Sequence, residues 1–171
     1  MTTTKSTRSK NSPEIRALSI AGPFARLIAE GSKEIELRSW RTSYRGLVLL
    51  HSSSSRDYDY FFSSLEMNQG ECPKAAIIGV ATLTDCITYS TEDLWNSDLD
   101  RHWWMGNEPY ATIRQQYYGS KPPIGHVFAN PAVFVPPIPD VPGARQYWLP
   151  KNKRQYQAFE EAIALCEQLF P

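Results

Sequence analysis

The chain has 171 residues, with 18 basic and 18 acidic side chains, and this length suits one domain with its own hydrophobic core. The balanced charge excludes a protein coated in positive charge, so any affinity for nucleic acid must come from a local patch. No apolar run approaches the ~18 residues of a membrane span, and we expect no association with a membrane. Three cysteines without close spacing predict a reduced, cytoplasmic chain.

The chain divides into a short tail and one domain. Residues 1–13 are rich in Ser, Thr and Lys and lack apolar periodicity, which predicts a disordered tail ahead of a domain over 14–171. Alternating or continuous apolar runs predict strands at 17–20, 34–40, 47–53 and 75–87. Apolar residues at helical spacing predict helices at 23–31, 58–65 and 152–170.

The second half of the chain is less regular. Residues 92–95 predict one helical turn, and 113–118 fit a helix or a strand. Residues 127–135 predict a strand that is interrupted at Asn130-Pro131. The C-terminal helix has an apolar stripe formed by Tyr156, Phe159, Ile163, Cys166 and Phe170. Short strands with a few outer helices favour an α+β or mainly-β barrel.

The segment from residue 31 to residue 51 carries the clearest chemical pattern. Strand alternation places Glu36, Arg38 and Trp40 on one face, with Lys33 near its start, while Ile35 and Leu37 point the other way. A guanidinium can bind a phosphate with two hydrogen bonds, and an indole can stack on a base. The pattern therefore predicts a site for an anionic, planar ligand. A solvated strand face with salt bridges is the alternative.

The same segment resembles the signature of the ASCH domain family, which belongs to the PUA-like superfamily. The core pattern is G-x-K-x-x-E-x-R after a short helix, formed here by Gly31, Lys33, Glu36 and Arg38. Further matching pieces are Pro23-Phe24-Ala25, Leu27-Ile28, Trp40-Arg41, Arg45-Gly46, the strand Leu49–Ser52, the strand 78–81, and the end from Pro136 to Trp148. The resemblance covers most of residues 17–148.

The resemblance implies a small, partly open β-barrel with peripheral helices and a cleft beside the first helix, lined by Lys33, Glu36 and Arg38. It implies recognition of RNA or of a modified nucleotide or nucleoside. The runner-up is hydrolysis, as in family members that resemble ribonucleases or that remove acetyl groups from acetylated cytidine. Those small amidohydrolases carry threonine where this chain has Glu36, so the same hydroxyl chemistry is not available here.

Other residues complete the predicted ligand-binding set. Arg45 adds positive charge, His51 could be an acid or base at the cleft floor or a structural histidine, and Trp148 could form the opposite wall. If the protein is an enzyme, Lys33 is the predicted base or charge stabiliser and Glu36 the proton-transfer group. A non-catalytic protein-interaction module is the third possibility. The scattered histidines and cysteines predict no metal and no cofactor.

Overall fold

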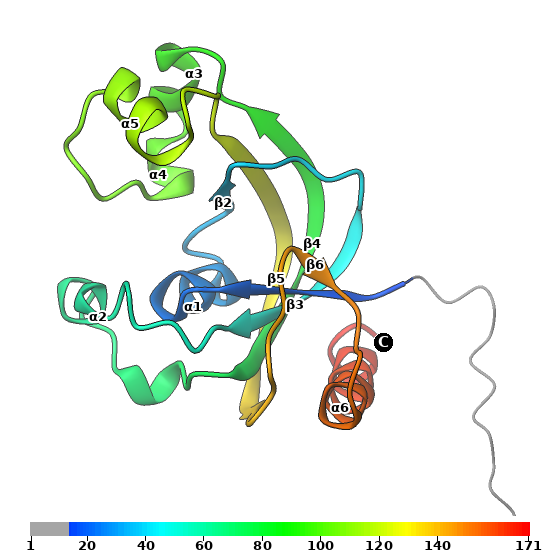
Figure 1. Cartoon of the computed structure of the whole chain (residues 1–171). Helices are drawn as coiled ribbons and strands as arrows, with labels where there is room; N and C mark the ends of the chain where they lie inside the picture. Colours follow the sequence, from blue (N-terminus) through cyan, green and yellow to red (C-terminus); the bar gives the residue numbers. More distant parts are fainter. Residues whose placement is uncertain (1–13) are drawn as a thin grey trace, which may run out of the picture.

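One mixed six-stranded sheet organises residues 14–171, the part of the chain that this computed structural model describes; the prediction for residues 1–13 lies outside it. The strands are β1 (Arg16–Ile20), β2 (Ile35–Arg38), β3 (Gly46–Ser52), β4 (Ala76–Thr88), β5 (Ile124–Ile138) and β6 (Tyr147–Trp148). Their order across the sheet is β2-β5-β4-β3-β1-β6, with β1 and β3 parallel and the other pairs antiparallel. The sheet curls into a half-barrel (Figure 1).

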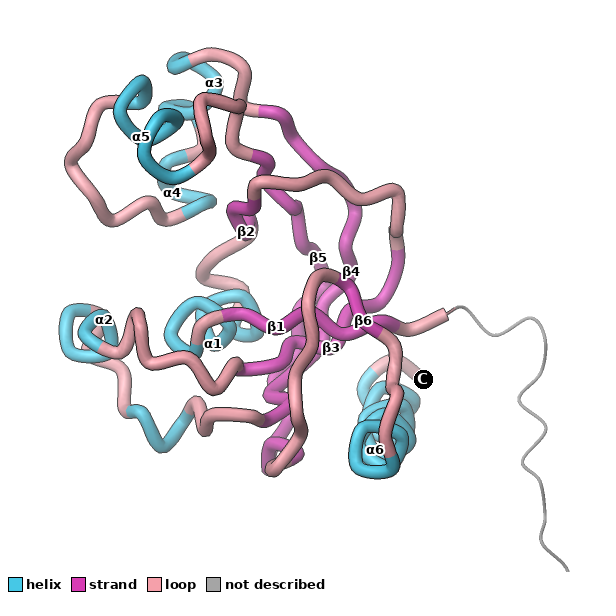
Figure 2. Tube along the Cα trace, viewed as in Figure 1, coloured by secondary structure: helices cyan, strands magenta, loops and turns pink. Residues whose placement is uncertain are grey.

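Helices lie on both sides of the sheet and beyond one end of it (Figure 2). They are α1 (Gly22–Glu30), α2 (Tyr60–Ser64), α3 (Glu92–Ser97), α4 (Leu99–His102), α5 (Tyr110–Tyr117) and α6 (Lys153–Leu169), with a 3₁₀ turn, η1, at Gln69–Glu71. Helix α1 and helix α6 cover opposite sides of the sheet, whereas α3, α4 and α5 gather beyond the point where β4 leads into β5 (Figure 1). Within residues 14–171, no helix is long and apolar enough to cross a membrane.

Strand alternation divides the core into two layers. On β1 and β3, Leu18 and Leu50 join the cluster beneath α1, while Ala17 and Leu49 join the cluster beneath α6. A close approach at Gly79 fixes α1 on the sheet, because a Cβ there would collide with the Ala132 carbonyl and lie 3.0 Å from the Ala29 Cβ. The loop that follows α1 is therefore held at a defined place over the sheet.

The structure confirms the predicted α+β partly open barrel and refines several elements. Residues 113–118 belong to helix α5 apart from Tyr118, which caps it. Strand β5 is longer than predicted and continues through Asn130-Pro131, where its pairing with β4 shifts register. The stripe predicted for α6 is wrong at both ends, because Tyr156 and Phe170 are exposed and Gln155 and Ala158 are buried instead.

Candidate functional site

The turn that ends α1 sets the position of Lys33. Gly31 adopts a left-handed conformation with φ of 83°, which favours glycine, and its N–H donates to the Ile28 carbonyl. The Lys33 N–H then donates to the Leu27 carbonyl at 3.1 Å, so the chain folds back on the helix before β2 begins. This turn directs the Lys33 side chain toward β2, and the side chain is only 4% exposed.

Lys33, Glu36 and Arg38, which we call the charged cluster, meet at β2. The Lys33 Nζ donates to Oε2 of Glu36 at 3.0 Å and also to the Ile35 carbonyl. The Arg38 Nη2 lies 3.5 Å from Oε1 of the same carboxylate and donates to the Ser19 carbonyl at 2.9 Å. Two cations thus share one carboxylate, which leaves the cluster with one net positive charge.

Burial controls the ionisation of the charged cluster. Loss of solvation lowers the pKa of Lys33, and the neighbouring Glu36 carboxylate offsets only part of that effect. Burial alone would raise the pKa of Glu36, but the charges of Lys33 and Arg38 outweigh it and the pKa lies below its usual value. The lowered pKa of Lys33 makes its neutral amine more accessible than that of a solvated lysine.

Two further features characterise the surroundings of the charged cluster. Nε of Arg38 is buried and has no hydrogen-bond partner among the described residues. A buried unpaired donor costs about 1–3 kcal/mol, and an anionic oxygen would satisfy it. Tyr118, at the end of α5, is a neighbour that the sequence did not indicate: burial and the Glu36 carboxylate raise the pKa of its phenol.

Trp40 lies beside the charged cluster, because it packs on His126, the β5 residue that pairs with Glu36. Strand β2 ends at Arg38 and the chain then bends, so Trp40 is not part of the strand. The indole packs edge-on against His126, with ring centroids 4.8 Å apart, and against Tyr147 at 5.6 Å. His126 links these residues through hydrogen bonds to the Trp40 carbonyl and the Tyr147 hydroxyl, both 2.8 Å long. Trp40 is therefore a partly buried packing residue.

His51 and Trp148 lie together, apart from the charged cluster. His51 is 1% exposed, and its Nε2 lies 2.7 Å from the Val141 carbonyl, which can only accept a hydrogen bond. Its Nδ1 is therefore the acceptor from the Ser19 hydroxyl at 2.9 Å, and the Trp148 indole N–H donates to the same hydroxyl at 3.1 Å. The Ser19 carbonyl accepts a hydrogen bond from Arg38, so Ser19 connects His51 and Trp148 with the charged cluster.

Arg45 also lies away from the charged cluster. It is exposed in the bend before β3, where it bonds to the carbonyls of Thr42 and Tyr44 and lies 3.5 Å from an oxygen of Asp85. An exposed ion pair of this length contributes about 0–1 kcal/mol. The structure thus brings together three of the seven predicted ligand-binding residues, namely Lys33, Glu36 and Arg38.

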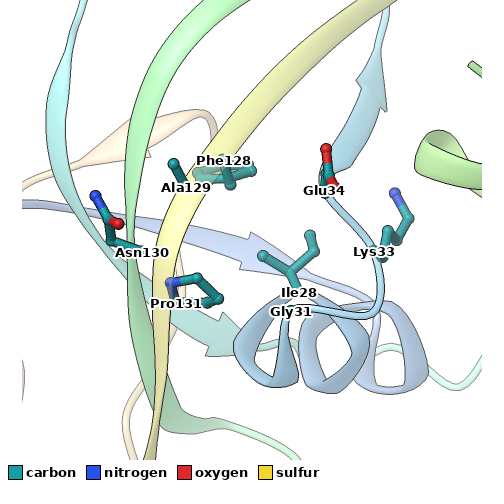
Figure 3. A pocket seen from close by; sticks show the side chains of 8 residues that line it. All are labelled: Ile28, Gly31, Lys33, Glu34, Phe128, Ala129, Asn130 and Pro131. Carbon is teal, nitrogen blue, oxygen red and sulfur yellow. The ribbon is translucent and has the colours of Figure 1, made fainter.

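Two surface hollows border the predicted residues. One, of about 330 Å³, lies between the end of α1 and residues 128–131 of β5, with Lys33 and Glu34 at its edge (Figure 3). The other, of about 580 Å³, lies beside Tyr147 and Trp148 and is bordered by Arg16, Arg145 and Lys151. Both volumes fall in the range of about 300–1,000 Å³ that is common for ligand sites.

No group of three or more His, Cys, Asp or Glu side chains in the described part of the chain is placed to hold a metal ion. All three cysteines are free and buried.

The half-barrel, its outer helices and the charged cluster after α1 define a PUA-like domain. The ASCH domain family matches residues 18–125, which is more than half of the chain. The chain belongs to the ASCH domain family.

Solved structures support the same fold. An ASCH protein from Zymomonas mobilis superposes with a TM-score of 0.57 at 14% identity, covering 86% of this chain and 94% of that one. Two single-residue mutants of the Zymomonas mobilis protein superpose similarly, also at 14% identity. One has a TM-score of 0.55 and covers 86% of this chain and 94% of its own. The other has a TM-score of 0.52 and covers 87% of this chain and 98% of its own. A comparison with curated proteins found no match.

Proposed function

We propose that the protein binds RNA, or a modified nucleotide or nucleoside, through the charged cluster of Lys33, Glu36 and Arg38. The observation that carries the proposal is the Arg38 guanidinium: its side chain is 25% exposed, its buried Nε has no hydrogen-bond partner within residues 14–171, and its cluster has one net positive charge. A phosphate or a polar base edge would supply the missing acceptor in a region of low dielectric, where charge-assisted hydrogen bonds are strong. The membership of the ASCH family supports this class of ligand.

Hydrolysis is the second candidate, and the lowered pKa of Lys33 favours it. A neutral lysine amine can act as a general base, and the lowered pKa makes that form more accessible, with Glu36 at 3.0 Å as the proposed proton-transfer group. The substrate would be RNA or an amide on a nucleoside. We also propose a cytoplasmic location, which the three free thiols support.

A binding assay with matched variants tests the first proposal. We expect Arg38→Lys to weaken binding of single-stranded RNA or of a nucleotide about tenfold or more, because an ammonium cannot reproduce the guanidinium geometry. Lys153→Ala removes an exposed cation at the start of α6 and is the control. Equal affinity of wild type, Arg38→Lys and the control would contradict the proposal.

A turnover assay separates binding from hydrolysis. Wild-type protein is incubated with RNA and, separately, with acetylated cytidine, and cleavage or acetate release is followed. If the second candidate is correct, Lys33→Met and Glu36→Gln both abolish turnover, while Glu36→Gln leaves most of the binding intact. Turnover that survives both substitutions would overturn the roles given to these two residues.

A further inference from the structure

A set of aromatic side chains continues outward from the charged cluster. We call it the aromatic ledge: Phe24 from α1, Tyr58 from the turn before α2, and Tyr60 and Phe61 from the first turn of α2. The Phe24 ring lies 5.6 Å from that of Tyr58 and 5.5 Å from that of Phe61, while Tyr60 and Phe61 are 4.2 Å apart. Tyr58 and Phe61 are nearly parallel, with an interplanar angle of 10°. The ledge is therefore one packed group of rings.

The outer part of the aromatic ledge is uncovered. Tyr58 is 44% exposed and Tyr60 is 63% exposed. Both carry hydroxyl groups, yet no hydrogen bond from either phenol is formed among residues 14–171. Neighbouring exposed aromatic rings are a common platform for ligands that have flat faces.

The ledge is continuous with the charged cluster. The Lys33 ammonium lies 5.9 Å from the centre of the Phe24 ring, which is within the range of a cation–π contact. Burial raises the pKa of the Tyr118 phenol, and Glu36 of the cluster and Tyr58 of the ledge both add to that effect. A ligand atom bound at the charged cluster would thus lie at the inner end of the ledge.

Charge near the ledge is balanced, which indicates how the ledge would contribute to binding. Arg56 and Lys74 both contact Asp59, at 3.5 Å and 2.6 Å, and Asp57 is exposed beside them. Two cations and two carboxylates give this segment no net charge, so it offers no attraction for phosphates. Any affinity here must come from stacking, which tolerates every base because each has a flat π face.

We propose that the aromatic ledge stacks the unpaired bases of a single-stranded RNA whose adjoining nucleotide is held by the charged cluster. This inference rests on the proposed function and specifies its substrate class: an oligonucleotide with splayed, unpaired bases instead of a free nucleoside or a duplex. Bases in a duplex are already stacked on their neighbours and cannot lie on the ledge.

The test compares hexa-adenylate RNA, AMP and a short RNA duplex as ligands of the full chain. We expect Tyr58→Ala and Tyr60→Ala each to weaken hexa-adenylate binding by about fivefold to a hundredfold, since stacking is worth about 1–3 kcal/mol per base. AMP binding should stay unchanged. Tyr60→Phe keeps the ring and should keep the affinity. Tyr156→Ala removes an equally exposed tyrosine on α6 and is the matched control.

The dependence on salt gives a second, independent readout. Because stacking releases no counterions, the ledge variants should lower hexa-adenylate affinity without changing its salt slope, whereas Arg38→Lys should lower AMP and hexa-adenylate affinity together. Unchanged hexa-adenylate affinity in the ledge variants, or equal affinity for the duplex, would overturn the inference while the proposed function stands. If Arg38→Lys binds AMP and hexa-adenylate as wild type does, the proposed function itself fails.

Discussion

Breaking the Lys33–Glu36 pair is the most informative perturbation of the fold. The two charges are 3.0 Å apart with side chains 4% and 12% exposed, so their attraction is about 5 kcal/mol at an effective dielectric constant of about 20. Removing one partner from a buried pair typically costs about 3–5 kcal/mol. Because Arg38 still neutralises Glu36 from 3.5 Å, we expect Lys33→Met to cost about 3 kcal/mol.

A double-mutant cycle measures that coupling directly. Lys33→Met leaves an unbalanced carboxylate, and Glu36→Gln leaves a buried ammonium, but the double variant leaves neither. We therefore expect the double variant to lose less stability than the two single losses combined, by about 2–3 kcal/mol. The assay is equilibrium urea unfolding of the four proteins near neutral pH. Losses that add within about 0.5 kcal/mol would show that the two charges do not interact, because independent sites behave that way.

Three further predictions concern stability. All three histidines are buried with a lowered pKa, chiefly through loss of solvation. Below about pH 6.5 the unfolded chain therefore binds more protons than the folded one, so the free energy of unfolding is highest above that pH and falls as the pH drops. The loss is up to about 1.4 kcal/mol per pH unit for each histidine that stays neutral in the folded state. Urea unfolding between neutral and mildly acid pH measures this, and a flat profile would contradict it. Gly79→Ala should cost about 2 kcal/mol or more in the same assay, because its Cβ meets the Ala132 carbonyl. Gly119→Ala meets no atom but has a left-handed φ of 57°, so it should cost only the backbone strain of about 1 kcal/mol and separates strain from collision. Asn152→Ala should cost about 1 kcal/mol, since the Asn152 side chain accepts the Gln155 N–H at 2.9 Å and caps α6; a thermal melt that matches wild type would contradict this.

Local signals predicted many elements well. Pro23 and Gly31 bounded α1, Asn152 marked the start of α6, and the break in strand pairing fell at the predicted Asn130-Pro131. Each of these depends on residues that are close together in the chain, which is why a single sequence contains the information. The charged cluster was found in the same way, because its members lie within six residues.

Residues brought together from distant parts of the chain were not predictable. Ser19 reaches His51 because β1 and β3 pair in parallel with these residues opposite each other, a register that no local pattern shows. Tyr118, whose phenol pKa the Glu36 carboxylate raises, is positioned by the packing of α5, which lies more than 70 residues from Glu36 in the chain. Strand β2 ends two residues before Trp40, so the contact of Trp40 with His126 depends on the bend after the strand and not on alternation.

The aromatic ledge was missed for a related reason. Tyr58 and Phe61 were recognised as one face of a short helix, but Phe24 comes from a different helix and joins them only in the folded chain. Nothing in the local sequence distinguishes rings that fill a core from rings that remain exposed. The exposed fractions of Tyr58 and Tyr60 make that distinction.

The proposed ligand binds the charged cluster at Arg38. Nitrogen-detected NMR of the arginine side chains tests this binding directly, with the Arg38 Nε resonance assigned by its loss in Arg38→Lys. On titration with single-stranded RNA, we predict a large shift of this resonance and slower exchange of its proton, while the Arg154 resonance on α6 stays in place. An Arg38 Nε resonance that does not change while RNA binds elsewhere would contradict the account.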